Sequence, residues 1–91
     1  MLESSVESRS VKHAKSFGLE VYKLQGRGAP DRLFIVPGKD SLFFVEFKKP
    51  GEKPKEHQKR EHARLRTKGF SVFVIDSFDD FKAALNWELE L

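Results

Sequence analysis

Two acidic residues and a lysine have the types and the spacing that hydrolysis of a phosphodiester bond requires. Asp31 follows Pro30 at the end of a glycine-rich turn, and Glu46 stands two residues before Lys48 in an apolar run. Carboxylate oxygens are ligands that a divalent ion such as Mg²⁺ prefers. A lysine beside them can stabilise a phosphate oxyanion or position a water molecule. These three residues therefore suggest metal-assisted hydrolysis of a phosphate ester.

Strand geometry would bring these side chains together. Alternate residues of a strand share a face, so Glu46 and Lys48 point one way while Val45 and Phe47 point the other. Phe47 would pack in the core, and its backbone carbonyl could add an oxygen ligand. If the strand entered by Asp31 pairs with the strand of Glu46, both carboxylates approach one end of the sheet. Together with water, these groups would form a Mg²⁺ or Mn²⁺ site.

Two further polar residues occupy helical positions that could face the same region. Glu7 shares a helix face with Val11 and Ala14. Its carboxylate is either a capping-box partner of Ser4 or a member of an interior site, and periodicity leaves both possibilities open. Gln58 lies on the side of a later helix that is expected to face the sheet. A buried amide needs hydrogen-bond partners, which a carboxylate or a water at a metal site would supply.

The hydrophobic pattern and the turn residues predict the element order α-β-β-β-α-β-α. The expected helices start near residue 4 or 5, near 54 and after 77, and the expected strands cover 20–24, 33–36, 42–48 and 70–75. The strand-helix-strand unit over 42–75 predicts a right-handed parallel crossover. The first three strands predict an antiparallel meander. We therefore expect an α/β fold with a mixed four-stranded sheet.

Three local features carry more specific expectations. Pro54 suits the first turn of its helix, because that position needs no backbone N–H. The run 72–75 is apolar throughout, which is typical of a strand covered on both faces. The last helix is expected to run to about Asn86. The tail 85–91 alternates apolar and polar residues, so it fits either a short strand or a frayed amphipathic end.

Positive charge is concentrated in one part of the chain. Residues 48–68 contain nine Lys or Arg and three acids, a net charge of +6, whereas 76–91 contain five acids and one lysine, a net charge of −4. A concentrated basic stretch is the electrostatic footprint of a protein that binds a polyanion. A solvated helix face is the simpler explanation of the same pattern.

Composition limits the class of protein. The 91 residues are expected to form one domain with a small core, to which a partner chain could add. The chain has no cysteine, which excludes disulfides, thiolate metal sites and a cysteine nucleophile. No apolar run approaches the roughly 20 residues of a membrane span, and no signal-peptide pattern is visible. We expect an intracellular protein with no membrane partner.

The residues around the two acids resemble a known family. Pro30-Asp31 with Glu46-Phe47-Lys48 resembles the active-site signature of the PD-(D/E)xK nuclease superfamily. The wider pattern is similar to the VRR-NUC domain (virus-type replication-repair nuclease) in its stand-alone phage or bacterial form. Four stretches carry that similarity: Gly28–Arg32, Phe44–Pro50, Gln58 and Gly69–Val72. The Val-Arg-Arg triplet behind the family name is absent, and the nearest basic sequence is Ala63–Arg66.

The resemblance implies a restriction-endonuclease-like αβββαβ core followed by a C-terminal helix. It also implies site roles: Asp31 and Glu46 as metal ligands, Lys48 to orient or activate the attacking water, and Gln58 to support the site. Glu7 would match the acid on the first helix that often completes the metal environment. Phe47 stands where family members often carry Leu or another apolar residue. The implied reaction is Mg²⁺- or Mn²⁺-dependent hydrolysis of DNA that leaves a 5′-phosphate.

The implied substrate is DNA, held by its backbone phosphates without base readout. The candidate contacts are basic residues near Asp31 or in the basic segment: Arg27, Arg32, Lys49, Lys53, Lys55, Lys59 and Arg60. No recognition helix is evident, so we expect structure-selective cleavage. Stand-alone members resemble Holliday-junction resolvases, which act as homodimers and make two symmetric cuts. The resemblance thus implies branched or junction DNA, a homodimer, and the cytoplasm of a bacterium or a phage-infected cell.

The C-terminal segment has more apolar residues than its length can easily bury. They are Phe78, Phe81, Leu85, Trp87, Leu89 and Leu91, and we expect some of them to form the dimer interface. Two other classes of protein stay open. One is a non-catalytic nucleic-acid-binding module with the same fold. The other is a small α/β interaction domain in which Asp31 and Glu46 only pair with local arginines.

Overall fold

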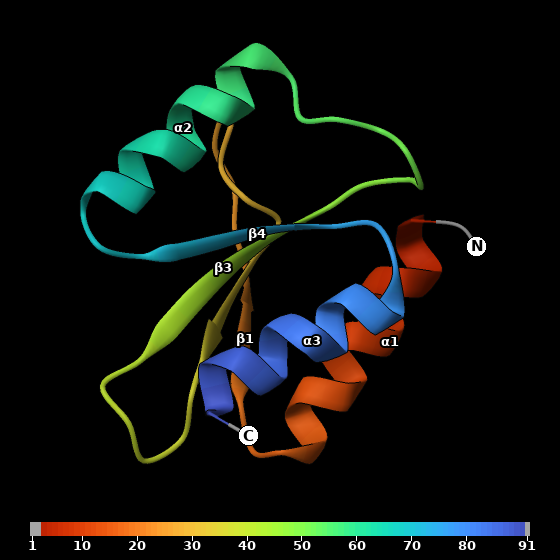
Figure 1. Cartoon of the computed structure of the whole chain (residues 1–91), viewed down its shortest axis with the longest axis vertical. Helices are drawn as coiled ribbons and strands as arrows, with labels where there is room; N and C mark the ends of the chain where they lie inside the picture. The colour runs from red at the N-terminus through yellow and green to blue at the C-terminus, as the bar shows by residue number, and fades with distance from the viewer. Residues whose placement is uncertain (1–2, 91) are drawn as a thin grey trace.

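A four-stranded sheet forms the centre of the structure, with helices on both of its faces (Figure 1). The computed structural model describes residues 3–90. In chain order the elements are α1 (Glu3–Ser16), β1 (Glu20–Lys23), β2 (Arg32–Ile35), β3 (Leu42–Phe47), α2 (Glu56–Thr67), β4 (Ser71–Ile75) and α3 (Phe78–Leu89). The strands lie in the order β1-β2-β3-β4, with the first two pairings antiparallel and the last parallel. The predicted element order, meander and parallel crossover are confirmed.

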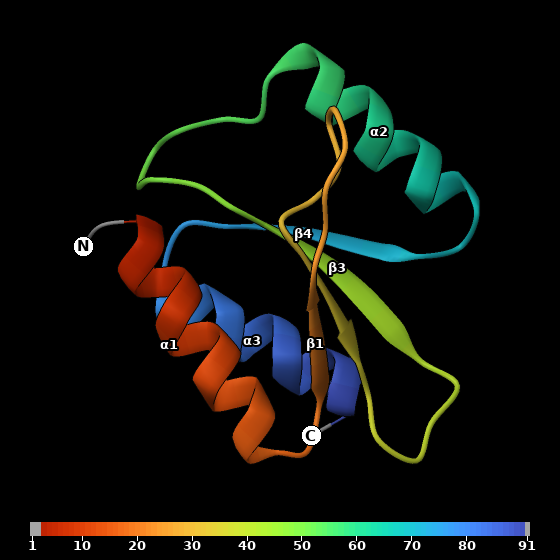
Figure 2. The ribbon, with the colours of Figure 1, turned by 180° about the vertical axis from the view of Figure 1, so that it is seen from behind.

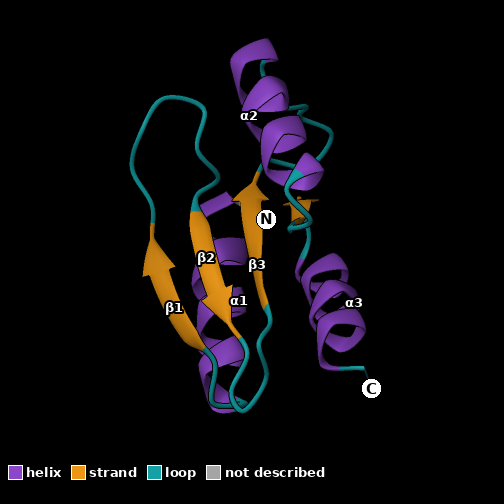
Figure 3. Cartoon of the chain, turned by 90° about the vertical axis from the view of Figure 1, so that its left-hand side faces the viewer, coloured by secondary structure: helices purple, strands orange, loops and turns teal. Residues whose placement is uncertain are grey.

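Helices α1 and α3 lie on the same side of the sheet (Figures 2 and 3), and the face of the sheet toward them holds the apolar core. Its largest fully buried side chains are aromatic or aliphatic: Phe34, Phe43, Phe47, Phe81, Val45 and Leu85. Phe34 pairs with Phe43 across β2 and β3, and their rings stack with centroids 5.0 Å apart. Burial of this area is the main favourable contribution to folding. The helix α2 lies on the opposite face of the sheet.

Two predictions about the ends of elements are wrong, although α1, which begins at Glu3, agrees with the predicted start near residue 4 or 5 to within two residues. Pro54 lies outside α2, because Lys55 is the N-cap and its backbone N–H is bound by the Gln58 side chain at 2.8 Å. The tail is neither a strand nor frayed. It continues α3 to Leu89, and Ser77 caps the start of that helix by accepting a hydrogen bond from the Asp80 N–H at 3.1 Å.

Two of the six residues from which a dimer surface was expected are not available for it. Phe81 and Leu85 are fully buried in the core because α3 turns them toward the sheet. Trp87 stands on the other side of α3 with 76% of its surface exposed. Leu91 lies outside the described residues. Within the described part of the chain, no helix is long and apolar enough to cross a membrane.

The strand β4 is an edge strand and is covered less completely than predicted. On the side of α2, Val72 is buried but Val74 is 38% exposed, because the helix does not reach over it. The Ile75 carbonyl faces β3, where it accepts the Lys48 N–H at 2.9 Å. Carbonyls alternate along a strand, so the Val72 carbonyl faces the open edge. There it accepts a hydrogen bond of 2.6 Å from the Arg66 guanidinium of α2.

Candidate active site

Strand register places the two predicted carboxylates opposite one another. The pairing of β2 with β3 ends at Arg32 and Val45, and one further step along the same register sets Asp31 across from Glu46. Side chains of directly opposed residues share a face, here the face toward α2. Asp31 Oδ2 accepts the Phe47 N–H at 2.7 Å, which fixes the carboxylate at the end of β3.

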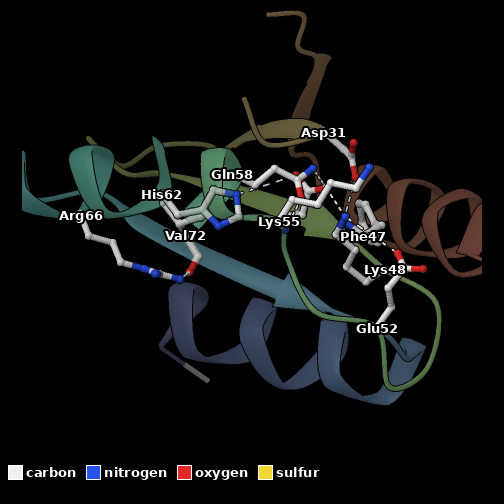
Figure 4. Close-up of polar contacts among 10 residues, drawn as sticks. Asp31, Phe47, Lys48, Glu52, Lys55, Gln58, His62, Arg66 and Val72 are labelled. Atoms are coloured by element: carbon white, nitrogen blue, oxygen red, sulfur yellow. Dashed lines mark hydrogen bonds and ion pairs between the residues drawn. The ribbon is translucent and has the colours of Figure 1, made fainter. Parts of the chain in front are cut away.

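Glu46 is a buried carboxylate held by polar groups from two directions. Figure 4 labels its neighbours Gln58, Lys48 and His62. Its Oε2 accepts a hydrogen bond from Gln58 Nε2 at 3.3 Å and lies 3.6 Å from Lys48 Nζ. Glu46 is 3% exposed and Lys48 is 7% exposed. The Lys48 ammonium also lies 3.9 Å from a carboxylate oxygen of Glu52, at the surface. The predicted shared face of Glu46 and Lys48 is therefore present, and both charges are withdrawn from bulk water.

Gln58 links this site to the start of α2. Its side-chain oxygen accepts the Lys55 N–H, one of the N–H groups that lack an intrahelical partner at a helix start, while its nitrogen donates to Glu46. One amide thus caps the helix and holds the carboxylate. The expectation that Gln58 faces the sheet and bonds a carboxylate is met by its bond to Glu46.

The Asp31 carboxyl is half-buried, and its surroundings disfavour the charged form. Burial raises the pKa of Asp31, which outweighs the lowering by the Phe47 N–H. The negative charge of Glu7 raises the pKa further, while Lys48 and Arg32 lower it. A cation bound between Asp31 and Glu46 would stabilise the charged form and reverse this penalty.

Glu7 reaches the edge of the site through an ion pair. Its Oε2 accepts from Arg32 Nε at 2.7 Å, and both side chains are about one-fifth exposed, at 22% and 23%. Strand alternation explains the pairing, because Arg32 follows Asp31 and so points to the opposite face, toward α1. The structure thus brings Glu7 near Asp31 but directs its carboxylate to a guanidinium. In this arrangement the Arg32 cation is engaged by the protein itself.

His62 is a site residue to which sequence reasoning gave no role. It follows Gln58 by one helical turn, and that spacing was the available signal. The residue is 1% exposed, and Nε2 lies 3.8 Å from Glu46 Oε1. Burial lowers the pKa of His62, and the positive charges of Arg66 and Lys48 lower it further. The imidazole is therefore neutral at neutral pH.

A positively charged rim borders the site. The loop before β2 packs against the start of α2, and a Cβ built on Gly28 would lie only 2.8 Å from the His57 carbonyl oxygen. Burial lowers the pKa of His57, and so do the charges of Arg27, Lys55 and Arg60, which gather around it. The other expected cations, Lys49, Lys53 and Lys59, are also exposed. This rim is defined here as Arg27, Lys55 and Arg60.

Within residues 3–90, no group of three or more His, Asp or Glu side chains is placed to hold a metal ion. The available donors at the strand ends are the carboxylates of Asp31 and Glu46, with main-chain carbonyls nearby. Such a pair suits an ion that keeps most of its ligands as water, as Mg²⁺ does.

Comparison with known proteins identifies the family. No protein-family model matches the chain. A solved structure described as a VRR_NUC domain superposes with a TM-score of 0.84 at 39% identity, over 92% of this chain and 94% of that one. "Putative nuclease p44" of Acyrthosiphon pisum secondary endosymbiont phage 1 is 45% identical over 80 residues, 85% of each chain. This chain belongs to the VRR-NUC family.

The resemblance and the fold class predicted from the sequence are thereby confirmed, and the VRR-NUC domain described here is a nuclease domain. Its strand ends bring together the residues that the sequence singled out. Asp31, Glu46, Lys48 and Gln58 form one contiguous polar site, and His62 joins them from α2. Chemically, the site offers two carboxylates for a cation and one ammonium for an anion.

Proposed function

We propose that this VRR-NUC domain is a Mg²⁺- or Mn²⁺-dependent endonuclease that hydrolyses phosphodiester bonds in branched DNA. The observation that carries the proposal is the opposed pair Asp31, just before β2, and Glu46, near the end of β3, with the buried Lys48 ammonium 3.6 Å from Glu46. Burying these charged side chains does little for stability, since removing a charge from water costs several kcal/mol per ion. A bound cation would use the carboxylates of Asp31 and Glu46, and a bound phosphate would use the Lys48 ammonium.

The donor set fits a hard divalent ion. Asp31 Oδ2 is engaged by the Phe47 N–H, and burial raises the pKa of this carboxyl, so a nearby cation would be favoured. Asp31, Glu46 and the Phe47 carbonyl would hold the ion, with water in its other positions. Glu7 could join them only by leaving Arg32. When bound, the metal would polarise the scissile phosphate and lower the pKa of a coordinated water.

The protein groups would act around that ion. Lys48 would orient the attacking water or stabilise the charge that develops on the phosphate oxygens. Gln58 would keep Glu46 in place, because its amide bonds both the carboxylate and the start of α2. The rim, together with Lys49, Lys53 and Lys59, would contact backbone phosphates. Arg32 would contact DNA only if its pair with Glu7 opened.

Selectivity for branched DNA and a homodimeric state belong to the same proposal. One chain supplies one site, and two symmetric cuts at a four-way junction need two chains related by a two-fold axis. Trp87 is the exposed aromatic of α3 and the best remaining contribution from the C-terminal segment to a dimer. The enzyme would act in the cytoplasm of a bacterial or phage-infected cell.

A cleavage assay tests the reaction. Wild type, Asp31→Asn and Glu46→Gln are compared on duplex, flap and four-way-junction DNA with Mg²⁺, Mn²⁺ or EDTA. We expect cleavage by the wild type only with metal, fastest on the junction, and loss of at least about 100-fold in each variant. Lys82→Ala on α3 is the matched control and should cut normally, because its ammonium pairs with Asp79, on α3.

DNA binding separates this proposal from a non-catalytic module. Both site variants should keep the affinity of the wild type for DNA, with a strong salt dependence. DNA binding without metal-dependent cleavage by the wild type would instead support the module. Cleavage that survives both substitutions would refute the assigned site.

The oligomeric state needs its own measurement. Light scattering after gel filtration should give a dimer for the wild type at micromolar concentration, and Trp87→Lys should shift it toward the monomer. A wild-type monomer under these conditions would contradict the dimer while leaving the assigned chemistry intact.

A further inference from the structure

His62 is a buried polar side chain directly behind the Glu46 carboxylate. Its side chain is 2% exposed, and its Nε2 is fully enclosed without a hydrogen-bond partner. The nearest carboxylate oxygen is Glu46 Oε1 at 3.8 Å, slightly beyond hydrogen-bond range. A buried donor left without a partner costs free energy, so such a group in a folded protein calls for an explanation.

We propose that His62 is a positioning residue, which donates from Nε2 to Glu46 Oε1 and holds this carboxylate in its metal-binding orientation. The inference rests on the proposed function, because it assigns His62 a part in a metal site. It goes beyond the signature residues, because His62 lies outside the motif and would act through Glu46.

The contacts of Glu46 support this role. Gln58 Nε2 donates to one carboxylate oxygen, Oε2, whereas His62 faces the other, Oε1. Both partners come from the same face of α2, one turn apart. Donors on both oxygens would fix the rotation of the carboxylate plane, which a single donor leaves free. Groups that orient metal ligands in this way commonly change metal affinity by 10- to 100-fold when they are removed.

The position of His62 suits the task, because its buried Nε2 lies on the side of Glu46 Oε1 and is enclosed away from water. A small movement of either side chain closes the gap of 3.8 Å to a hydrogen bond.

A pair of substitutions distinguishes positioning from packing. His62→Phe keeps a flat ring but removes the donor, whereas His62→Gln restores a donor at a similar reach. Mn²⁺ is titrated by calorimetry into each full-length chain. We expect affinity 10- to 100-fold weaker for His62→Phe and recovery by His62→Gln. Unchanged affinity in a folded His62→Phe protein would overturn the proposal.

Leu65→Ala is the matched control for α2. Leu65 is buried on the same helix at 9% exposure, and no polar contact links it to Glu46. This variant should lose thermal stability while keeping the wild-type affinity for Mn²⁺. If Leu65→Ala weakened Mn²⁺ binding as much as His62→Phe, loose packing of α2 would explain both, and the proposal would fail.

A metal-free measurement decides the proposal even if the wild type binds no Mn²⁺. Nitrogen NMR of the imidazole should show the Nε2–H tautomer of His62, and Glu46→Gln should shift the Nε2 resonance. Failure of Mn²⁺ binding by the wild type would refute the proposed function alone. An Nε2 resonance that is unprotonated, or insensitive to Glu46→Gln, would refute the role of His62.

Discussion

The two faces of the sheet bury very different side chains. Toward α1 and α3, β3 places Phe43, Val45 and Phe47, all at most 1% exposed, in an apolar core. Toward α2, the same strand and its exit place Glu46 and Lys48, which are almost as deeply buried. One strand therefore supplies both faces by simple alternation.

The difference shows how a small domain can combine stability with a charged site. The aromatic face gains free energy from apolar burial, whereas the α2 face holds charges whose removal from water is costly. The two requirements are met by opposite sides of a rigid strand. Substitutions on the two faces should consequently separate loss of folding from loss of chemistry.

The largest effect on stability should come from truncating a buried side chain on the apolar face. Phe43→Ala removes a ring that stacks on Phe34 and is fully buried, so we expect a loss of about 3–5 kcal/mol in the free energy of unfolding. Urea denaturation measures it. Trp87→Ala, at a site 76% exposed in the single chain, should stay within about 0.5 kcal/mol when measured at a concentration that keeps the chain monomeric. A large loss under these conditions would show that Trp87 packs against its own chain.

On the other face, Lys48→Met should lower the rate of DNA cleavage. It keeps the length of the side chain but removes the ammonium next to Glu46, so cleavage should fall about 100- to 1,000-fold. Single-turnover rates on saturating DNA measure the effect, and DNA binding should persist. Cleavage at the wild-type rate would show that Lys48 takes no part in the reaction.

A glycine pair tests how firmly the loop before β2 is held against α2. Gly38 has a φ of +71° and open space around it, so Gly38→Ala should cost only the left-handed conformation, about 1–2 kcal/mol. Gly28 has a φ of +78°, and its new Cβ would also meet the His57 carbonyl at 2.8 Å. Gly28→Ala should therefore cost more and should also weaken DNA binding, as measured by unfolding and by fluorescence anisotropy. Equal losses of stability in Gly38→Ala and Gly28→Ala would mean that the loop before β2 moves freely away from α2.

The smallest effect concerns the stability of the metal-free protein at different pH values. The pKa of Asp31 is raised from its ordinary value of 3.8 in the folded chain, so the charged form disfavours folding. This penalty is absent below pH 3.8 and appears as the pH rises through the raised value. Asp31→Asn should thus raise the unfolding temperature at pH 7 in EDTA, by an amount that shrinks toward pH 4. A difference that does not vary with pH would contradict this.

Much of the fold follows from local patterns in the sequence. The alternation over 42–48 was enough to assign the opposite faces of Glu46 and Phe47, because strand geometry is periodic. The end of α3 was not predictable in the same way. Its alternating tail also satisfies a helical face, and only packing of Phe81 and Leu85 on the sheet decides between the two.

The site was predictable where it depends on one strand and less so where it depends on tertiary contacts. The pairing of Glu7 with Arg32 joins residues 25 positions apart, and it arises because Arg32 points to the face of α1. His62 shares a helix face with Gln58, but its depth beside Glu46 depends on how α2 lies on the sheet. Spacing can indicate a shared face, whereas burial and partners come only with the assembled fold.

The bond between Arg66 and the outward-facing Val72 carbonyl has a consequence for solubility. An open edge strand offers its unpaired main-chain groups to the edges of other molecules, and β4 is apolar along most of its length. The Arg66 side chain occupies one of those groups at 2.6 Å and places a positive charge beside it. It thereby opposes edge-to-edge aggregation of the domain.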